Sequence, residues 1–160
     1  MLHITVLAVG RLKEDYLVKG AGEYLKRLTP YAKISIEEIA DERIPDRPVE
    51  SDRERVKDVE GKRILSRLKE SAFLVALDAK GASFSSEEMA AELQKLVTAG
   101  NSRITFVIGG SLGLSEKILR RADMRLSFSR FTFPHQLFRL ILLEQLYRWL
   151  KINRGEPYHH

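Results

Sequence analysis

Short apolar segments alternate five times with amphipathic segments along this chain, and this alternation limits the fold more than any other feature. The first apolar segment, residues 2–9, is rich in β-branched residues and ends at Gly10, which is typical of a buried strand. We predict strands over residues 2–9, 33–39, 72–77, 103–108 and 124–129, and helices over residues 14–28, 52–68, 85–98, 115–122 and 136–152. This order predicts an α/β fold with a mainly parallel sheet and helices on both faces.

Local signals mark several connections between these elements. Ser85 is followed three positions later by Glu88, the spacing of a capping box, and Ser115 is placed to cap the fourth helix. Residues 78–81 predict a turn, and residues 41–51, with two prolines and many charges, predict a loop. No linker or internal repeat divides the 160 residues, so we expect a single domain over residues 1–160.

Composition excludes several classes of protein. The chain has no cysteine, which excludes disulfides, cysteine-ligated metals and a cysteine nucleophile. None of the four histidines has metal-site spacing to carboxylates, so we expect no metal. The longest apolar run, residues 72–77, is far shorter than the roughly 20 residues that cross a bilayer, so we expect no membrane association. The amino terminus lacks the pattern of a signal peptide, and we expect a cytoplasmic protein.

Positive charge is concentrated at one end of the chain. Residues 1–100 hold 17 Lys and Arg against 18 Asp and Glu, whereas residues 101–160 hold 10 against 4. A one-sided positive field favours a polyanionic partner, and nucleic acid is the commonest. An unevenly charged but merely solvated surface is the alternative.

The last predicted helix, residues 136–152, is apolar on nearly all sides. Such a helix must be buried on more than one side. A homodimer in which a second copy covers one side is our prediction, and a two-fold interface is the commonest arrangement. A central helix buried within one chain is the alternative.

A glycine loop, residues 109–113, follows the fourth predicted strand. Open α/β sheets bind ligands outside the carboxyl ends of their strands, and glycine lets a ligand approach the backbone closely. On that view a branched side chain at Gly110 should abolish ligand binding. The loop does not fit the dinucleotide fingerprint, no acidic residue ends the next strand, and no Gly-Lys-Ser/Thr is present, so a plain NAD or ATP site is disfavoured. A tight turn without a ligand is the alternative.

Several short motifs occur in the order found in one known family. They are Leu-Ala-Val-Gly at 7–10, Glu-Tyr at 23–24, Phe-Val-Ile-Gly-Gly at 106–110, Leu-Ser-Phe-Ser at 126–129, Thr-Phe-Pro-His at 132–135, Glu-Gln-Leu-Tyr-Arg at 144–148 and Pro-Tyr-His at 157–159. Over essentially its full length the chain resembles the RlmH family of 23S rRNA (pseudouridine-N3)-methyltransferases, in the SPOUT superfamily. The pairing of Ile-Gly-Gly with Thr-Phe-Pro-His is specific to that family.

The resemblance implies a fold, a cofactor and a substrate. The fold would be an α/β knot, with a deep trefoil in about residues 100–160. S-adenosylmethionine would be held by three loops of a homodimeric enzyme, and the substrate would be a pseudouridine in helix 69 of 23S rRNA within the assembled ribosome. Carried over by position, the cofactor-binding residues would be Leu77, Gly109, Gly110, Phe128, Ser129, Arg130, Phe131, Thr132 and Phe133.

Methylation at N3 requires that this nitrogen lose its proton, so a base or a group that stabilises the anion is needed. The family's tail points to Arg154, Tyr158 and His159 as catalytic candidates. His159 is suited to accept a proton near neutral pH, and Arg154 or Arg139 to hold a phosphate or stabilise the anion. The residues leave the choice open, as they leave the role of Glu156, an acid beside an expected RNA site.

Two other functions compete with a methyltransferase. One is a non-catalytic RNA-binding α/β domain that uses only the basic C-terminal third. The other is an oxidoreductase in which Arg130 binds the 2′-phosphate of NADP.

Overall fold

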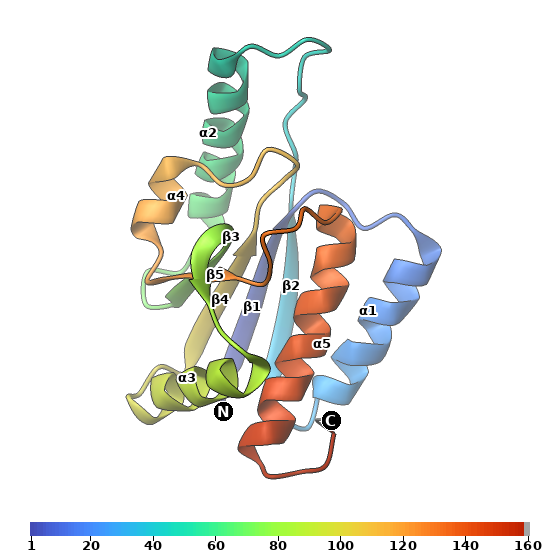
Figure 1. Cartoon of the computed structure of the whole chain (residues 1–160), viewed down its shortest axis with the longest axis vertical. Coiled ribbons are helices and arrows are strands. Elements are labelled where there is room, and N and C mark those ends of the chain that lie inside the picture. Colours follow the sequence, from blue (N-terminus) through green and yellow to red (C-terminus); the bar gives the residue numbers. More distant parts are fainter. Residues whose placement is uncertain (159–160) are drawn as a thin grey trace.

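The computed structural model describes residues 1–158, in which strands and helices alternate from the amino to the carboxyl end (Figure 1). The strands are β1 (His3–Val9), β2 (Lys33–Ile39), β3 (Phe73–Ser83), β4 (Arg103–Ile108) and β5 (Met124–Ser127). The helices are α1 (Asp15–Leu28), α2 (Glu50–Arg67), α3 (Ser86–Thr98), α4 (Glu116–Arg121) and α5 (His135–Asn153). All ten elements expected from the sequence pattern are present.

The five strands form one sheet in the order β2-β1-β4-β3-β5, and every neighbouring pair is parallel. The central strands are buried on both faces, which is why their sequences are nearly continuous apolar runs rather than alternating ones. Because all strands run the same way, the loops after β3, β4 and β5 meet at one edge of the sheet. The prediction of a parallel α/β fold is confirmed.

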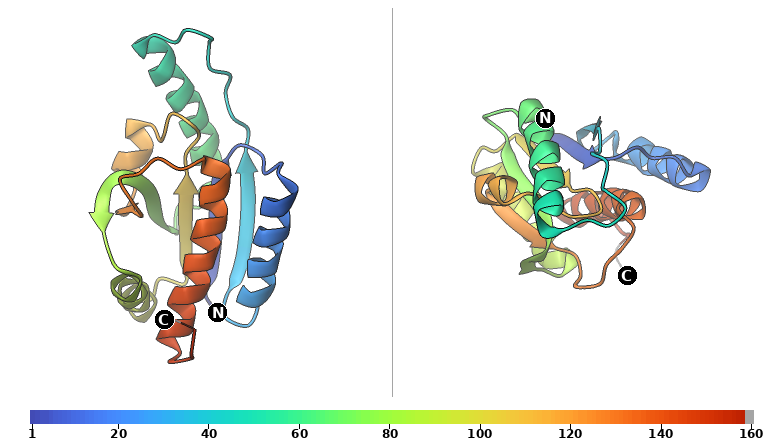
Figure 2. Two further views of the ribbon diagram at one scale, coloured as in Figure 1. Left: turned by 45° about the vertical axis from the view of Figure 1, so that its right-hand side comes forward. Right: turned by 90° about the horizontal axis from the view of Figure 1, so that it is seen from above.

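Helices cover both faces of the sheet (Figure 2). Residues of α1, α3 and α5 share one apolar cluster with one face, where Trp149 stacks on Phe106 at 6.1 Å between ring centroids. Ile64 of α2 and Ile118 of α4 belong to a second cluster on the other face. Helix α5 lies between α1 and α3 and runs back from the carboxyl edge of the sheet to its amino edge (Figure 1).

The sequence allows two explanations for the apolar surface of α5: a second copy covers one side of the helix, or the helix is buried within one chain. None of its residues is fully exposed, and Leu142, Leu143 and Leu146 are completely buried. The sheet, α1 and α3 supply this burial within one chain, so the apolar surface of α5 is explained largely without a partner. The homodimer therefore stays a prediction, as does the trefoil knot. None of the helices within residues 1–158 combines the length and apolar character needed to cross a membrane.

The boundaries of β3 and β5 differ from the sequence prediction. Leu77 and Ala82 both pair with Leu126, so residues 78–81 bulge out of the ladder while β3 continues to Ser83. The predicted turn is thus an interruption within a strand, because pairing with β5 resumes after it. Strand β5 ends at Ser127, two residues early, where the Ser127 hydroxyl donates to the Ala79 carbonyl oxygen at 3.0 Å.

The predicted helix caps are confirmed. The Ser85 hydroxyl accepts from the Glu88 N–H, and the Glu88 carboxylate accepts from the Ser85 N–H at 2.8 Å. The Ser115 hydroxyl accepts from the Ile118 N–H and begins α4. Helix α2 begins at Glu50, slightly earlier than predicted, after the expected loop.

Candidate active site

A cavity of about 150 Å³ lies at the carboxyl edge of the sheet, where the segments after β3, β4 and β5 meet. We call it the glycine-loop cavity. Its lining is mostly glycine and aromatic, with a few polar groups. The lining residues are Leu77, Asp78, Ala79, Ile108, Gly109, Gly110, Gly113, Leu126, Phe128, Ser129, Phe131, Phe133, His135 and Phe138.

Most residues predicted to bind a cofactor meet in this cavity. From the predicted set, Leu77, Gly109, Gly110, Phe128, Ser129, Phe131 and Phe133 line it. Arg130 and Thr132 do not. Both lie in the irregular segment between β5 and α5, in which Ser129, Phe131 and Phe133 do line the cavity. Thr132 instead lines another hollow, with Lys57 and Arg125.

The two predicted glycines are required by contacts within the protein. A Cβ on Gly109 would lie 2.8 Å from the carbonyl carbon of Gly113, which is backbone and cannot move aside easily. A Cβ on Gly110 would lie 3.0 Å from Oε1 of Glu60 and 3.2 Å from Val9. A side chain on Gly110 would therefore meet Glu60 and Val9, which is a reason within the protein for glycine at this position, and the close approach of a ligand to Gly110 stays a prediction.

Glu60 is a buried carboxyl group of α2, only 5% exposed, directly behind the glycine loop. Its Oε2 accepts from the Glu42 N–H at 3.0 Å. Burial raises the pKa of Glu60 above the ordinary value of 4.5, and the carboxylates of Asp41 and Glu42 add to this rise. The N–H of Glu42 and the Arg63 guanidinium act in the opposite direction.

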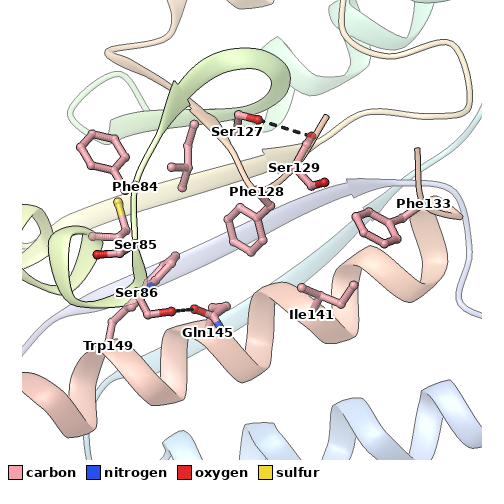
Figure 3. A pocket seen from close by; sticks show the side chains of 12 residues that line it. Phe84, Ser85, Ser86, Ser127, Phe128, Ser129, Phe133, Ile141, Gln145 and Trp149 are labelled. Carbon is pink, nitrogen blue, oxygen red and sulfur yellow. Dashed lines mark hydrogen bonds between the residues drawn. The ribbon is translucent and has the colours of Figure 1, made fainter. Parts of the chain in front are cut away.

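A second cavity, of about 280 Å³, adjoins the first on the side of α3 and α5 (Figure 3). The two share Leu126, Phe128, Ser129 and Phe133. Its other lining side chains come from the β3–α3 junction and from α5: Phe84, Ser85, Ser86, Met89, Ile141, Gln145 and Trp149, together with Ser127 from β5. The Ser86 hydroxyl and the Gln145 amide oxygen lie 2.7 Å apart across it (Figure 3). Phe128 and Phe133 thus form the wall between two hollows.

Seven lining residues of the glycine-loop cavity are outside the predicted cofactor set, and the side chains of Asp78, His135 and Phe138 are the largest functional or aromatic groups among them. His135 is the first residue of α5, and a Cβ on Gly10 would lie 3.1 Å from its Nε2. Its place in the Thr-Phe-Pro-His motif was the available signal.

Arg154 and Tyr158, the catalytic candidates of the tail that the structure describes, do not line this cavity within one chain. The tail, residues 154–158, packs on the α1 side of α5. Tyr158 donates a hydrogen bond to Glu144 at 2.9 Å and lies 4.8 Å from the ring of Tyr147, which in turn contacts Tyr24 of α1. The glycine-loop cavity lies on the opposite side of α5. His159 lies outside the described residues.

Arg154 and Glu156 are held by neighbouring side chains. The Arg154 guanidinium lies 4.5 Å from the centre of the Tyr31 ring and donates to the Pro30 carbonyl oxygen. Glu156 accepts from the Tyr31 hydroxyl at 2.6 Å and from the Lys151 ammonium at 2.7 Å. Glu156 therefore anchors the tail to α5 and to the turn between α1 and β2, which accounts for an acid at this position.

Arg139 does not fit the proposed role in phosphate binding. Its side chain is 4% exposed, and it pairs with Glu38 at 2.7 Å and with the Gly10 carbonyl oxygen. It ties α5 to β2 and to the end of β1. Within the part of the chain that the structure describes, no group of three or more His, Cys, Asp or Glu is placed to hold a metal ion.

These features describe a class of protein. A family model described as "Predicted SPOUT methyltransferase" matches residues 2–159, so the chain belongs to the SPOUT methyltransferase family. A protein of Pelotomaculum thermopropionicum named "Ribosomal RNA large subunit methyltransferase H" is 65% identical over 160 residues, covering 100% of both chains. Proteins of the same name from Alkaliphilus oremlandii and Listeria monocytogenes are 56% and 54% identical over 158 residues, covering 99% of each chain.

A comparison of folds agrees with this membership. The solved structure of "a probable methylase family protein from Haemophilus influenzae Rd KW20" covers 99% of this chain and 70% of its own, with a TM-score of 0.52 at 10% identity. Membership in a methyltransferase family excludes the oxidoreductase with Arg130 on a 2′-phosphate and the purely non-catalytic RNA-binding domain.

The glycine-loop cavity suits S-adenosylmethionine, the methyl donor of such families. Apolar and aromatic walls fit an adenine ring, and backbone groups of the glycine loop are available to hydrogen-bond its polar edges. Its lining side chains include one carboxyl group, from Asp78, and one imidazole, from His135.

Proposed function

We propose that this protein transfers the methyl group of S-adenosylmethionine to N3 of a pseudouridine in helix 69 of 23S rRNA within the assembled ribosome. Three supports combine: membership in the SPOUT methyltransferase family, relatives of more than half identity named as large-subunit rRNA methyltransferases, and the surplus of basic residues after position 100. We propose that the reaction takes place in the cytoplasm, where ribosomes are found.

One observation carries the proposal for the cofactor. Leu77 lies in β3 just before its bulge, Gly109 and Phe128 directly follow β4 and β5, and the parallel sheet brings all three to one cavity. Bound there, S-adenosylmethionine supplies a methyl group on a positively charged sulfur, which a nucleophilic nitrogen can displace. Leu77, the glycine loop and Phe128–Phe133 would hold and orient the cofactor, and orientation accounts for much of the rate in such a transfer.

The tail residues have different capacities for the removal of the N3 proton. Burial, followed by the hydrogen bond to Glu144, raises the pKa of Tyr158 well above its ordinary value of 10.0, so its hydroxyl stays protonated and acts as a hydrogen-bond donor. Arg154 is permanently cationic and suited to hold a phosphate or stabilise the N3 anion. His159 remains the candidate for accepting the proton near neutral pH.

The position of the tail leads us to propose a homodimer. The cavity contacts α5 at His135 and Phe138 in its first turn, whereas the tail folds back along the helix, with Glu156 on Lys151 and Tyr158 on Glu144. Glu144 is about 13 Å along the helix from His135. A second copy whose α5 runs in the opposite direction would bring its tail to the cavity of the first. We propose such an arrangement, with each active site shared between subunits and a trefoil knot within about residues 100–160.

Mass spectrometry of rRNA tests the reaction. Ribosomes that lack the modification are incubated with the protein and S-adenosylmethionine, and we expect one methyl group on N3 of a single pseudouridine in helix 69. Free 50S subunits in a parallel reaction test the requirement for the assembled ribosome. Ribosome binding without methylation would overturn the enzymatic proposal.

A further inference from the structure

Glu60 is separated from the glycine-loop cavity only by the backbone of Gly110. Gly110 lines that cavity with one side, and on its other side both carboxylate oxygens of Glu60 lie within 3.3 Å of the position a Cβ would take. Because glycine has no side chain, no side-chain atoms of Gly110 lie between the Glu60 carboxylate and the cavity. A charge on Glu60 therefore lies close to whatever occupies the cavity.

The charge of Glu60 has little compensation in the protein. Within residues 1–158, no Lys, Arg or His nitrogen lies within 4.0 Å of its carboxylate, and the one hydrogen bond it accepts comes from the Glu42 N–H. Arg63, a cation of α2 whose charge acts on Glu60, donates to the Ala40 carbonyl oxygen and to Glu42 instead. A buried carboxyl group without a counter-charge lowers stability, and such groups concentrate at functional sites.

We propose that Glu60 is a specificity-determining residue of the cavity, whose carboxylate favours a cationic methyl donor over its neutral product. This inference rests on the proposed function. S-adenosylmethionine has a positive sulfonium, whereas S-adenosylhomocysteine, which remains after transfer, has a neutral thioether. The carboxylate of Glu60 would thus strengthen donor binding and weaken product retention. Asp78 contributes a carboxylate at the surface of the same cavity, where solvent screens it more than the buried Glu60.

Binding of two cofactor analogues to Glu60→Gln tests this role without any catalysis. The glutamine has the same shape, and its amide oxygen can still accept from the Glu42 N–H. Sinefungin has a protonated amine in place of the sulfonium, and S-adenosylhomocysteine has no charge there. By calorimetry at mildly alkaline pH, we expect the affinity for sinefungin to fall by about five- to tenfold and that for S-adenosylhomocysteine by less than about twofold.

A matched control removes a carboxylate elsewhere. The side chain of Glu116 in α4 is 62% exposed, and Glu116→Gln should leave the ratio of the two affinities unchanged. Equal loss of both analogues in Glu60→Gln, with an unchanged ratio, would mean that Glu60 only shapes the loop, and the proposal would be wrong. If the wild-type chain binds neither analogue, the proposed cofactor fails first and this inference with it.

The pH dependence gives a second readout. As the pH falls toward the raised pKa of Glu60, its carboxylate takes up a proton, and the preference of the wild-type chain for sinefungin should diminish. Asp41, Glu42 and Arg63 around Glu60, and Asp78 and His135 in the cavity, are common to both proteins. The difference between wild type and Glu60→Gln therefore isolates Glu60, and parallel pH curves would contradict the proposal.

Discussion

The glycine-loop cavity and the tail are the two regions that the family resemblance connects with catalysis, and they are built in different ways. The cavity is enclosed by close backbone contacts, in which Gly109 faces Gly113 and Gly81 faces the backbone of Arg125 at distances that exclude a Cβ. The tail is held by long polar and aromatic side chains. Tyr31, Lys151 and Glu156 form one group, and Tyr158, Glu144 and Arg148 form another.

The difference teaches which changes each region tolerates. Backbone contact in the cavity is sensitive to added volume, because carbonyl and amide atoms move only if the loop moves. Side-chain pairs in the tail are sensitive to charge and pH, and the partly exposed ones add little to overall stability. The cavity is therefore expected to tolerate no added side chain at Gly109, whereas the tail should tolerate substitutions that keep its charges and hydrogen bonds.

Removal of residues 157–160 should give the largest effect. These residues include Tyr158 and His159. We expect the rate of methyl transfer to fall by at least about a hundredfold, because the candidate acceptor of the N3 proton is then missing. Transfer of labelled methyl groups to ribosomes measures this. Binding of S-adenosylhomocysteine should change little in the same protein.

An experiment with mixed subunits tests whether the tail acts in the active site of the partner subunit. Combining the truncated chain with a chain whose cavity is blocked should restore part of the activity if the tail works in the partner's site. Full activity of the truncated protein by itself would remove the tail from catalysis.

Gly109→Val should have the second largest effect, and this effect should arise from the cavity and not from the tail. A side chain there meets the Gly113 backbone at 2.8 Å, so the loop must shift and the cavity must change shape. We expect S-adenosylhomocysteine affinity to fall at least about tenfold and the melting temperature to fall by several degrees. Calorimetry and thermal unfolding measure the two effects. Retained affinity would show that the loop is not part of the cofactor site.

Glu156→Gln should loosen the tail in a pH-dependent way. Its hydrogen bond with the Lys151 ammonium, and then that with the Tyr31 hydroxyl, lower the pKa of Glu156 below 4.5. A lowered pKa in the folded state means that the stabilisation is present at neutral pH and is lost as the pH falls through the folded-state value. We expect a melting temperature one or a few degrees below wild type at neutral pH, with the gap closing in acid. A gap that persists in strong acid would contradict this assignment.

Gly22→Ala is the smallest and the only stabilising change. Gly22 lies within α1, and a Cβ there has no neighbour within 4 Å, in contrast to Gly109. Alanine is favoured over glycine inside a helix by roughly 0.5–1 kcal/mol, so chemical denaturation should show a gain of that size. Ligand binding should not change. A loss of stability would show that α1 needs a glycine for a contact outside the single chain.

Much of the site was predictable from local patterns together with the family motifs. The three cofactor segments are short, and parallel strands must bring them to one edge of the sheet. Arg130 and Thr132 were included because the motif is continuous, but only some residues of this irregular segment line the cavity, and these two do not. Glu60 was not singled out, because a glutamate on a highly charged helix is indistinguishable in sequence from a solvated one.

The sequence by itself determined the order of strands and helices, their caps and the parallel sheet, since these follow from apolar periodicity and from residues close together along the chain. Only the tertiary structure decided which face of α5 the tail packs on, that Glu156 anchors it, that Arg139 is buried against Glu38, and that Glu60 lies behind Gly110. Glu156 and Tyr31, Arg139 and Glu38, and Glu60 and Gly110 are between 50 and 125 positions apart in the sequence. The tail and α5 are separate elements. Their meeting depends on how whole helices pack on the sheet, and no local pattern encodes that.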